Sequence, residues 1–288
     1  MGEIIKLLRM HQYVKNLFIF LPLLFSLSFA DMQGIRDTFE VFVLFSLLAS
    51  SVYIFNDFLD INEDRVHPTK KNRPLACGSV SKKSAIFLIL ALSITSLTLS
   101  FLLSKTLFGV LFLYFILNIF YSIKLKHIAI LDIFIIASGF VLRLFAGSSV
   151  ADIHLSMWII SMTFLLALFL ALAKRRDDVL LSLDGQQTRK NIDGYNLEFV
   201  NASMVLMAGV VIVSYIMYTI SPEVTARLGT EYLFLTSFFV ILGILRYMQI
   251  TFVEEDSASP TKVVIKDTFL KLTIFFWLLS FVGIVKLT

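Results

Sequence analysis

The sequence has little charge, one cysteine and five prolines. Of its 288 residues, 16% are charged, against roughly 25% in soluble globular domains, and 58% are hydrophobic. The single cysteine, Cys77, excludes an internal disulfide and lacks the spacing of a metal site. The sequence also lacks G-x-S-x-G, H-E-x-x-H and Walker motifs. These absences argue against a disulfide-stabilised domain, a soluble globular enzyme and the common hydrolase and nucleotidase classes.

Long apolar runs recur along the whole chain, and the mean hydropathy is +0.85. A bilayer about 30 Å thick is crossed by roughly 20 apolar residues in a helix. The pattern predicts an all-α polytopic membrane protein, one membrane domain over residues 1–288, with an interfacial amphipathic helix over 1–16. Nine transmembrane helices are predicted, near 17–30, 38–58, 84–104, 106–122, 128–148, 155–174, 200–220, 231–249 and 269–286.

The Lys and Arg residues divide unevenly between the two sides that nine spans define. With the N-terminus inside, 19 of them fall on inner segments and 4 on outer segments. Positive charge favours the cytoplasmic side, so we expect a multi-pass plasma or inner membrane protein with its C-terminus outside. The largest hydrophilic loops, at 59–83, 175–199 and 250–268, then face the cytoplasm, where we expect the site. The net charge of +4 is a topology signal, and no nucleic-acid partner is expected.

An acidic cluster lies at the inner end of the second predicted span, in "NDFLDINED". Asp57, Asp60 and Asp64 have i, i+3, i+7 spacing, which places them on one helical face with Asn56 beside them. Carboxylates stacked in this way repel one another unless a cation binds between them. Hard oxygen ligands suit Mg²⁺ that bridges to substrate phosphates. The alternative is a solvated helix end, although ionisable groups at a membrane span favour a functional interpretation.

Basic residues follow the acids directly, in "RVHPTKKNRP". Arg65, His67, Lys70 and Arg73 are candidates for binding anions, whereas Lys82 and Lys83 fit a simple anchor to anionic lipid. Further candidates of the same kind occur in the other inner segments: Lys15, Tyr121, Lys124, Lys126, Lys174, Arg175 and Arg189. Arg143 falls inside a predicted span and needs a polar partner or ligand there, for which Asp132 is one candidate.

"NDFLDINED" resembles the N-D-x-x-D-x-x-x-D motif of the UbiA superfamily of intramembrane prenyltransferases, a fold of nine transmembrane helices. "QYVKN", "YSIKLKHIAILD", "GFVLRLFAG" and "AKRRDD" look more like its decaprenyl-phosphate phosphoribosyltransferase branch. The usual second D-x-x-x-D after the sixth span is missing, because no two of Asp177, Asp178 and Asp184 are four apart. Three consecutive cations precede these acids, which suits a lipid monophosphate better than a second metal-bound diphosphate.

The resemblance implies transfer of 5-phosphoribosyl from phosphoribosyl diphosphate to a polyprenyl phosphate, with Mg²⁺ as cofactor. It implies metal binding by Asn56, Asp57, Asp60 and Asp64, and roles in catalysis for the last three with Arg73 and Lys126. The remaining cationic candidates, with Tyr121, would bind the substrates. Two alternatives stay open: transfer of a prenyl group from its diphosphate to an aromatic or lipid acceptor, and membrane transport. Chain length of the lipid and oligomeric state do not follow from the sequence.

Overall fold

The structure is a computed structural model that describes residues 2–26, 32–67, 70–151, 153–183, 192–255 and 260–287. Over these ranges the chain is helical and contains no strand, which confirms the predicted all-α class. Within the described residues, eight segments are long and apolar enough to cross a membrane. They are α3 (Met32–Leu59), α5 (Lys82–Leu103), α6 (Lys105–Ile123), α7 (Leu131–Ala151), α8 (Met157–Leu183), α9 (Leu197–Ile220), the segment Tyr232–Glu254 and α13 (Thr268–Leu287).

Shorter helices connect these segments. Tyr232–Glu254 itself consists of η5 (Tyr232–Thr236), α11 (Ser237–Gln249) and the π-helical turn η6 (Ile250–Glu254). The others are α1 (Gly2–Leu8), η1 (Met10–Phe20), α2 (Leu21–Ser26), α4 (Ile61–Val66), η2 (Lys70–Asn72), η3 (Leu125–His127), η4 (Ile192–Gly194), α10 (Pro222–Leu228) and α12 (Pro260–Lys266).

The N-terminal region differs from the prediction. The amphipathic helix expected over residues 1–16 is α1 followed by the 3₁₀ helix η1, with Arg9 in the left-handed conformation between them. The span expected near 17–30 is not among the eight long helices, because its described part is divided between η1 and α2. Residues 27–30 lie outside the described residues. The predicted count of nine is therefore not confirmed.

Helix ends follow local sequence signals. Ser81 caps α5 by accepting a hydrogen bond from the Ser84 backbone N–H at 3.1 Å, and Asn196 caps α9 through the Phe199 N–H at 2.7 Å. Pro222 opens α10, and Gly229, at φ 73°, ends it in the left-handed conformation. Local sequence signals thus mark where α5 and α9 begin and where α10 begins and ends.

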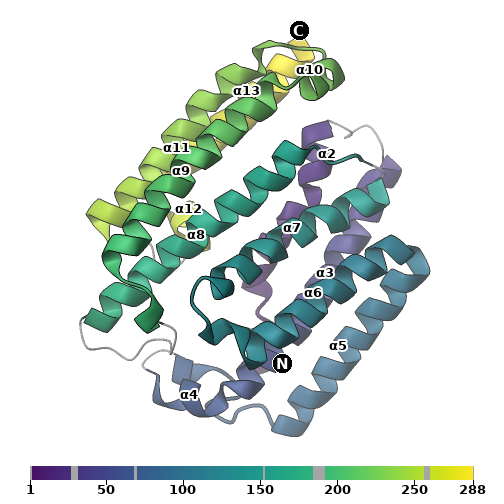
Figure 1. Cartoon of the computed structure of the whole chain (residues 1–288). Coiled ribbons are helices and arrows are strands. Elements are labelled where there is room, and N and C mark those ends of the chain that lie inside the picture. The colour runs from purple at the N-terminus through teal and green to yellow at the C-terminus, as the bar shows by residue number, and fades with distance from the viewer. Residues whose placement is uncertain are drawn as a thin grey trace. The chain divides into compact units, whose positions relative to one another are not determined.

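The chain forms two compact units, of which the first comprises residues 1–135 and 142–154. In this unit α3 packs against α5 and α6, and α1 and η1 lie on α3 (Figure 1). Ser96 of α5 donates a hydrogen bond to the Leu44 carbonyl of α3 at 2.8 Å, a polar contact between two spans. The apolar core around Phe45 and Leu48 includes Ile19 of η1. The N-terminal segment is therefore an integral part of this unit.

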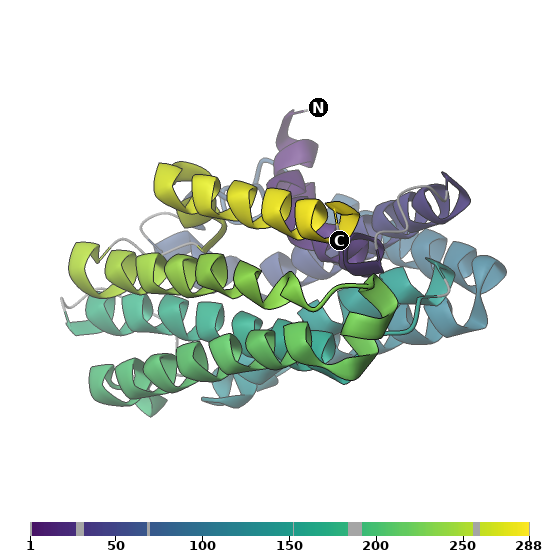
Figure 2. The ribbon, with the colours of Figure 1, turned by 90° about the horizontal axis from the view of Figure 1, so that it is seen from above.

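The second unit comprises residues 136–141 and 155–288. Within it α8 packs on α9, and α11 packs on both α9 and α13 (Figure 2). Tyr215 joins three of these segments, since its hydroxyl lies 2.7 Å from Thr236 Oγ1 and accepts a hydrogen bond from Trp277 Nε1 at 2.7 Å. Buried polar side chains thus connect neighbouring spans in this unit too.

Candidate active site

The acidic motif lies where α3 passes into α4. Backbone hydrogen bonds from Asp60 N–H to the Asn56 carbonyl (3.0 Å) and from Asp64 N–H to the Asp60 carbonyl (2.8 Å) carry the helical path across the junction. Asp57 and Asp64 are only 2% and 3% exposed, and Asp60 is half-buried. A helical path through all three acids is what the i, i+3, i+7 spacing requires. The acids are withdrawn from water far more than a solvated helix end would be.

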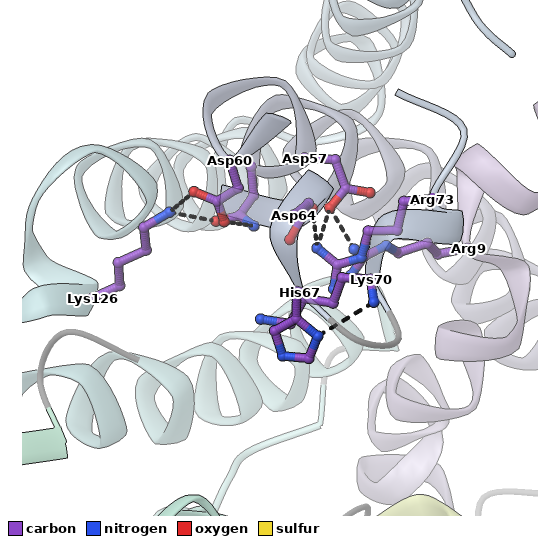
Figure 3. Close-up of polar contacts among 9 residues, drawn as sticks. Arg9, Asp57, Asp60, Asp64, His67, Lys70, Arg73 and Lys126 are labelled. Atoms are coloured by element: carbon purple, nitrogen blue, oxygen red, sulfur yellow. Dashed lines mark hydrogen bonds and ion pairs between the residues drawn. The ribbon is translucent and has the colours of Figure 1, made fainter. Parts of the chain in front are cut away.

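Arg73 bridges two of the acids. Its Nη1 donates to Asp57 Oδ1 at 3.0 Å and to Asp64 Oδ2 at 2.7 Å (Figure 3). Arg9, the left-handed residue between α1 and η1, donates a hydrogen bond from Nη2 to the same Asp57 oxygen. Its guanidinium carbon lies 5.6 Å from the Tyr53 ring centroid. Two guanidinium groups therefore converge on one buried carboxylate.

Lys126 of η3 pairs with the third acid, Asp60. Its Nζ lies 2.5 Å from Asp60 Oδ1 and 3.3 Å from Asn56 Oδ1, while Asn56 Nδ2 donates to Asp60 Oδ2 at 3.0 Å (Figure 3). The predicted Asn56, Asp57, Asp60 and Asp64 are thus assembled together with Arg73 and Lys126, which the sequence also singled out. Acids and bases that are separate along the chain form ion pairs in space.

The other predicted basic residues of this stretch lie in α4 and just after it: Arg65, His67 and Lys70. His67 Nδ1 accepts a hydrogen bond from the Lys70 backbone N–H at 3.4 Å, so the imidazole helps to shape this turn (Figure 3). Arg65 has a different role, because its Nε donates a hydrogen bond to the Ala76 carbonyl at 3.1 Å. Arg65 therefore fixes the path of the loop, whereas Figure 3 shows His67 and Lys70 beside the acids.

A second cationic centre lies within the same unit, around Arg143 of α7. Arg143 is 4% exposed and donates from Nε to Asn16 Oδ1 at 2.8 Å, with its Nη2 3.4 Å from the Tyr114 hydroxyl. Its guanidinium carbon lies 4.8 Å and 5.2 Å from the ring centroids of Phe45 and Tyr114. The suggested Asp132 pairing is wrong, since eleven residues along α7 correspond to about 16 Å.

Lys15 belongs to this centre as well. Burial, together with the positive charges of Arg143 and Arg9, lowers the pKa of Lys15 from 10.5 to about 8. No acid is paired with Lys15 among the described residues. A half-buried ammonium surrounded by like charges is an anion-binding arrangement, because an incoming phosphate would relieve the repulsion.

Five other predicted residues are not placed in these two centres. Lys124 is exposed and Tyr121 half-buried at the end of α6. Lys174 and Arg175 lie on α8 in the second unit, where Arg175 is fully buried and pairs with Asp178. The loop expected from residue 175 begins later than predicted, because α8 continues to Leu183. Arg189 lies outside the described residues.

Arg176, the third cation of "AKRRDD", is a structural residue of the second unit. It donates from Nε to Asn201 Oδ1 at 3.1 Å and from Nη1 to the Thr251 carbonyl at 2.7 Å. It also lies 5.3 Å from the Phe252 ring centroid. Arg176 therefore connects α8 with α9 and η6, a structural role that the sequence did not indicate, since it suggested phosphate binding for all three cations of this stretch.

Sequence reasoning missed three residues of the site: Arg9, Asn16 and Tyr114. In the sequence, Arg9 is one cation of a predicted amphipathic helix. Its side chain contacts Asp57 only because the backbone turns at this residue, where φ is 53°. Asn16 and Tyr114 are distant in sequence from Arg143. Asn16 ends the stretch "QYVKN" that carries part of the family resemblance, and Tyr114 was signalled only by its apolar surroundings, because a buried polar side chain needs a partner.

A family model described as the UbiA prenyltransferase family matches residues 18–279. The chain therefore belongs to this family of membrane transferases. It is 32% identical to a decaprenyl-phosphate phosphoribosyltransferase of Mycolicibacterium smegmatis, over 96% of this chain and 90% of that protein. It is 30% identical to the protein of the same name from Corynebacterium glutamicum, over 96% and 85%. A solved UbiA homolog from Archaeoglobus fulgidus, bound to GPP and Mg²⁺, shares the fold with a TM-score of 0.71 and 17% identity over 99% of each chain.

The residues of the acidic cluster fit Mg²⁺ in their chemistry. Carboxylate and amide oxygens of Asn56, Asp57, Asp60 and Asp64 are the ligand types that this ion prefers. Each acid contacts a cation, and no group of three or more His, Cys, Asp or Glu side chains in the described ranges is arranged around a metal position. A metal ion would therefore take over contacts that Arg9, Arg73 and Lys126 make here.

Proposed function

We propose that this protein transfers the 5-phosphoribosyl group of phosphoribosyl diphosphate to a polyprenyl phosphate. The products are a polyprenyl-phosphoryl-5-phosphoribose and diphosphate. The observation that carries the proposal is similarity over 96% of the chain to two proteins named for this transfer. The geometry supports the proposal, because the acidic cluster fits a metal-bound diphosphate and Lys15, which has no acidic partner among the described residues, fits the phosphate of a second substrate.

The donor would bind at the junction of α3 and α4. Asn56, Asp57, Asp60 and Asp64 would hold Mg²⁺, which when bound neutralises the negative charge of the leaving diphosphate. Basic residues beside the acids would hold the remaining phosphate oxygens by charge-assisted hydrogen bonds: His67, Lys70, Arg73 and Lys126. Ion pairs already orient Arg73 and Lys126, so little side-chain entropy remains to be lost when the donor binds.

The lipid phosphate would bind at the second centre, near Lys15 and Arg143. A phosphate monoester has a second pKa of about 6, so the attacking oxygen is already ionised near neutrality and needs no general base. The bond between ribose C1 and the diphosphate oxygen breaks, its electron pair leaves with diphosphate, and the lipid phosphate oxygen forms the new bond to C1. The protein's task is to position both anions and to stabilise the developing charge.

The proposed orientation places the N-terminus and the site on the cytoplasmic side of the cell membrane. The excess of Lys and Arg on the segments assigned to that side supports it. A polyprenyl chain would then lie along the apolar helices within the bilayer, and the charged donor would come from the aqueous side.

Prenyl transfer is the second candidate, favoured by a neighbouring structure that contains GPP and Mg²⁺. Purified protein is incubated with labelled phosphoribosyl diphosphate and polyprenyl phosphate, and separately with a prenyl diphosphate and 4-hydroxybenzoate. Mass analysis of the lipid product distinguishes the two reactions. A phosphoribosylated lipid supports the proposal, and a prenylated acceptor formed alone contradicts it.

Asp60→Asn tests the metal assignment within the same assay. We expect loss of Mg²⁺-dependent transfer with unchanged elution as a folded protein, because Asp60 is half-buried at the edge of the cluster. Asp37→Asn, near the opposite end of α3, is the matched control and should retain activity. Unchanged turnover in Asp60→Asn would refute the assignment of this carboxylate.

A further inference from the structure

Arg9 is held in an unusual position at the edge of the acidic cluster. Its backbone adopts φ 53° and ψ 45°, a left-handed conformation that is uncommon for residues other than glycine. The segment on either side is anchored on α3, because Ser50 donates to the Leu8 carbonyl at 2.8 Å and lies 2.8 Å from the Tyr13 hydroxyl. The surrounding packing therefore fixes a backbone turn that presents the Arg9 guanidinium to Asp57 (Figure 3).

Asp57 contacts two guanidinium groups, whereas Asp64 and Asp60 each pair with one cation. Arg73 contacts Asp57 while also pairing with Asp64, and Arg9 contacts Asp57 alone among the acids of the cluster. With Lys126 on Asp60, three acids face three cations, and the ion-paired cluster is neutral. A divalent cation that entered alone would leave two uncompensated positive charges in a largely buried site, which is unfavourable.

A metal–diphosphate complex does not incur this cost, because the phosphate oxygens bring their own negative charge. Arg9 can then exchange one anionic oxygen for another, from the Asp57 carboxylate to the diphosphate. The side chain is 19% exposed and rests on the Tyr53 ring, so it reaches the open edge of the cluster while its stem stays in place.

We propose that Arg9 is a positioning residue that acts as an exchangeable counter-ion of Asp57. Its guanidinium pairs with this carboxylate while the donor is absent and pairs with the diphosphate when a metal–diphosphate complex binds. The site therefore takes up the metal together with the diphosphate and binds the metal alone weakly. This inference rests on the proposed function only in requiring a diphosphate-bearing donor, whether the transferred group is phosphoribosyl or prenyl.

Two binding measurements on the purified protein in detergent test the proposal without any turnover. Binding of Mn²⁺ alone is followed by electron paramagnetic resonance, and binding of preformed Mn²⁺–diphosphate by isothermal titration calorimetry. In Arg9→Gln we expect Mn²⁺ alone to bind about tenfold more tightly, a factor that corresponds to ~1.4 kcal/mol, because Asp57 has lost a competing cation. We expect Mn²⁺–diphosphate to bind at least about tenfold more weakly, because a phosphate partner is gone.

These opposite shifts separate a counter-ion from a residue that only supports the fold, since a structural defect would weaken both kinds of binding. Arg36→Gln, which removes an exposed Arg–Glu40 pair at the other end of α3, is the matched control and should shift neither. Arg9→Lys should fall between the wild type and Arg9→Gln in both measurements. Equal Mn²⁺ affinity in the wild type and Arg9→Gln, or weakening of both kinds of binding, would overturn the proposal.

Tyr53→Leu provides a second variant should Arg9→Gln fail to fold. It removes the ring on which the guanidinium rests and so weakens the hold of Arg9 on Asp57 without removing its charge, and the same two shifts are expected with smaller size. No shift in either measurement would count against the proposal. Absence of phosphoribosyl transfer, by contrast, would contradict the proposed function and leave the binding results unaffected.

Discussion

Gly147 provides a test of how the N-terminal segment positions the cationic centre. It lies on α7, one turn beyond Arg143, and an added Cβ would be 1.9 Å from the Ile19 carbonyl oxygen and 2.9 Å from the Ile19 carbonyl carbon. These are backbone atoms of η1, so no side chain can rotate away. To restore an ordinary 3.4 Å contact, η1 must move by about 1.5 Å relative to α7.

The cost of Gly147→Ala can be estimated from these contacts. Overpacking typically costs about 1–3 kcal/mol. The shift of η1 also stretches the 2.8 Å bond between Asn16 and Arg143, and a hydrogen bond to a charged group is worth ~1.5–3 kcal/mol. We expect destabilisation of about 3 kcal/mol in total, which corresponds to a melting temperature roughly 6–12 °C lower for a chain of this size.

The assay is thermal unfolding of the purified protein in detergent, followed by intrinsic fluorescence, together with binding of a polyprenyl phosphate. Gly109→Ala is the matched control, because a Cβ at this helical glycine of α6 meets nothing within 4 Å. It should leave the melting temperature unchanged or raise it slightly. If Gly147→Ala melts like Gly109→Ala and binds the lipid phosphate like the wild type, the close approach of η1 to α7 does not position this centre.

Two further predictions concern the charges of the site. Arg73→Gln should destabilise the protein by about 3–5 kcal/mol, since it leaves Asp57 and Asp64 without their shared partner, and adding Asp64→Asn should recover at least ~1 kcal/mol of this loss in the same melting assay. Identical melting of the single and double variants would contradict this coupling. Affinity for a polyprenyl phosphate should fall as pH rises through about 8, because Lys15 then loses its charge, and Lys15→Arg should flatten the profile between pH 7 and 9. A wild-type profile already flat over that range would contradict the role of Lys15.

The long helices could be predicted from the sequence because twenty apolar residues in a row have few alternatives. The same logic did not give the end of α8, because the charged residues after its apolar run were taken as the start of a loop. "AKRRDD" continues α8 because Arg175 pairs with Asp178 one turn along and Arg176 is buried against Asn201. Charged residues whose partners lie on the same or a neighbouring helix do not end a helix, and those partners are set by tertiary packing.

The N-terminal segment was harder to predict because its apolar residues pack into two different hydrophobic clusters. Leu7 packs with Ile54 and Ile61, while Ile19 packs with Phe45 and Leu48 in a second cluster. The change of direction between them occurs at Arg9, whose left-handed conformation has no sequence signal of the kind that glycine or asparagine would give. A periodicity argument therefore produced one helix where the chain makes a turn that carries a site residue.

The order of charges along the chain also concealed their pairing. Four acids precede four bases in the segment from Asp57 to Arg73, which suggested acids that hold a metal and neighbouring bases that hold phosphates. The loop instead returns Arg73 to acids nine and sixteen residues earlier, and Arg9 reaches the same place from the N-terminus. Three bases, Arg9, Arg73 and Lys126, are thus held by the acids themselves, which the order of the charges did not indicate. Because two of the acids are buried, the proposed exchange of these ion pairs would favour ligands that bring metal and phosphate together, and a diphosphate donor has this property.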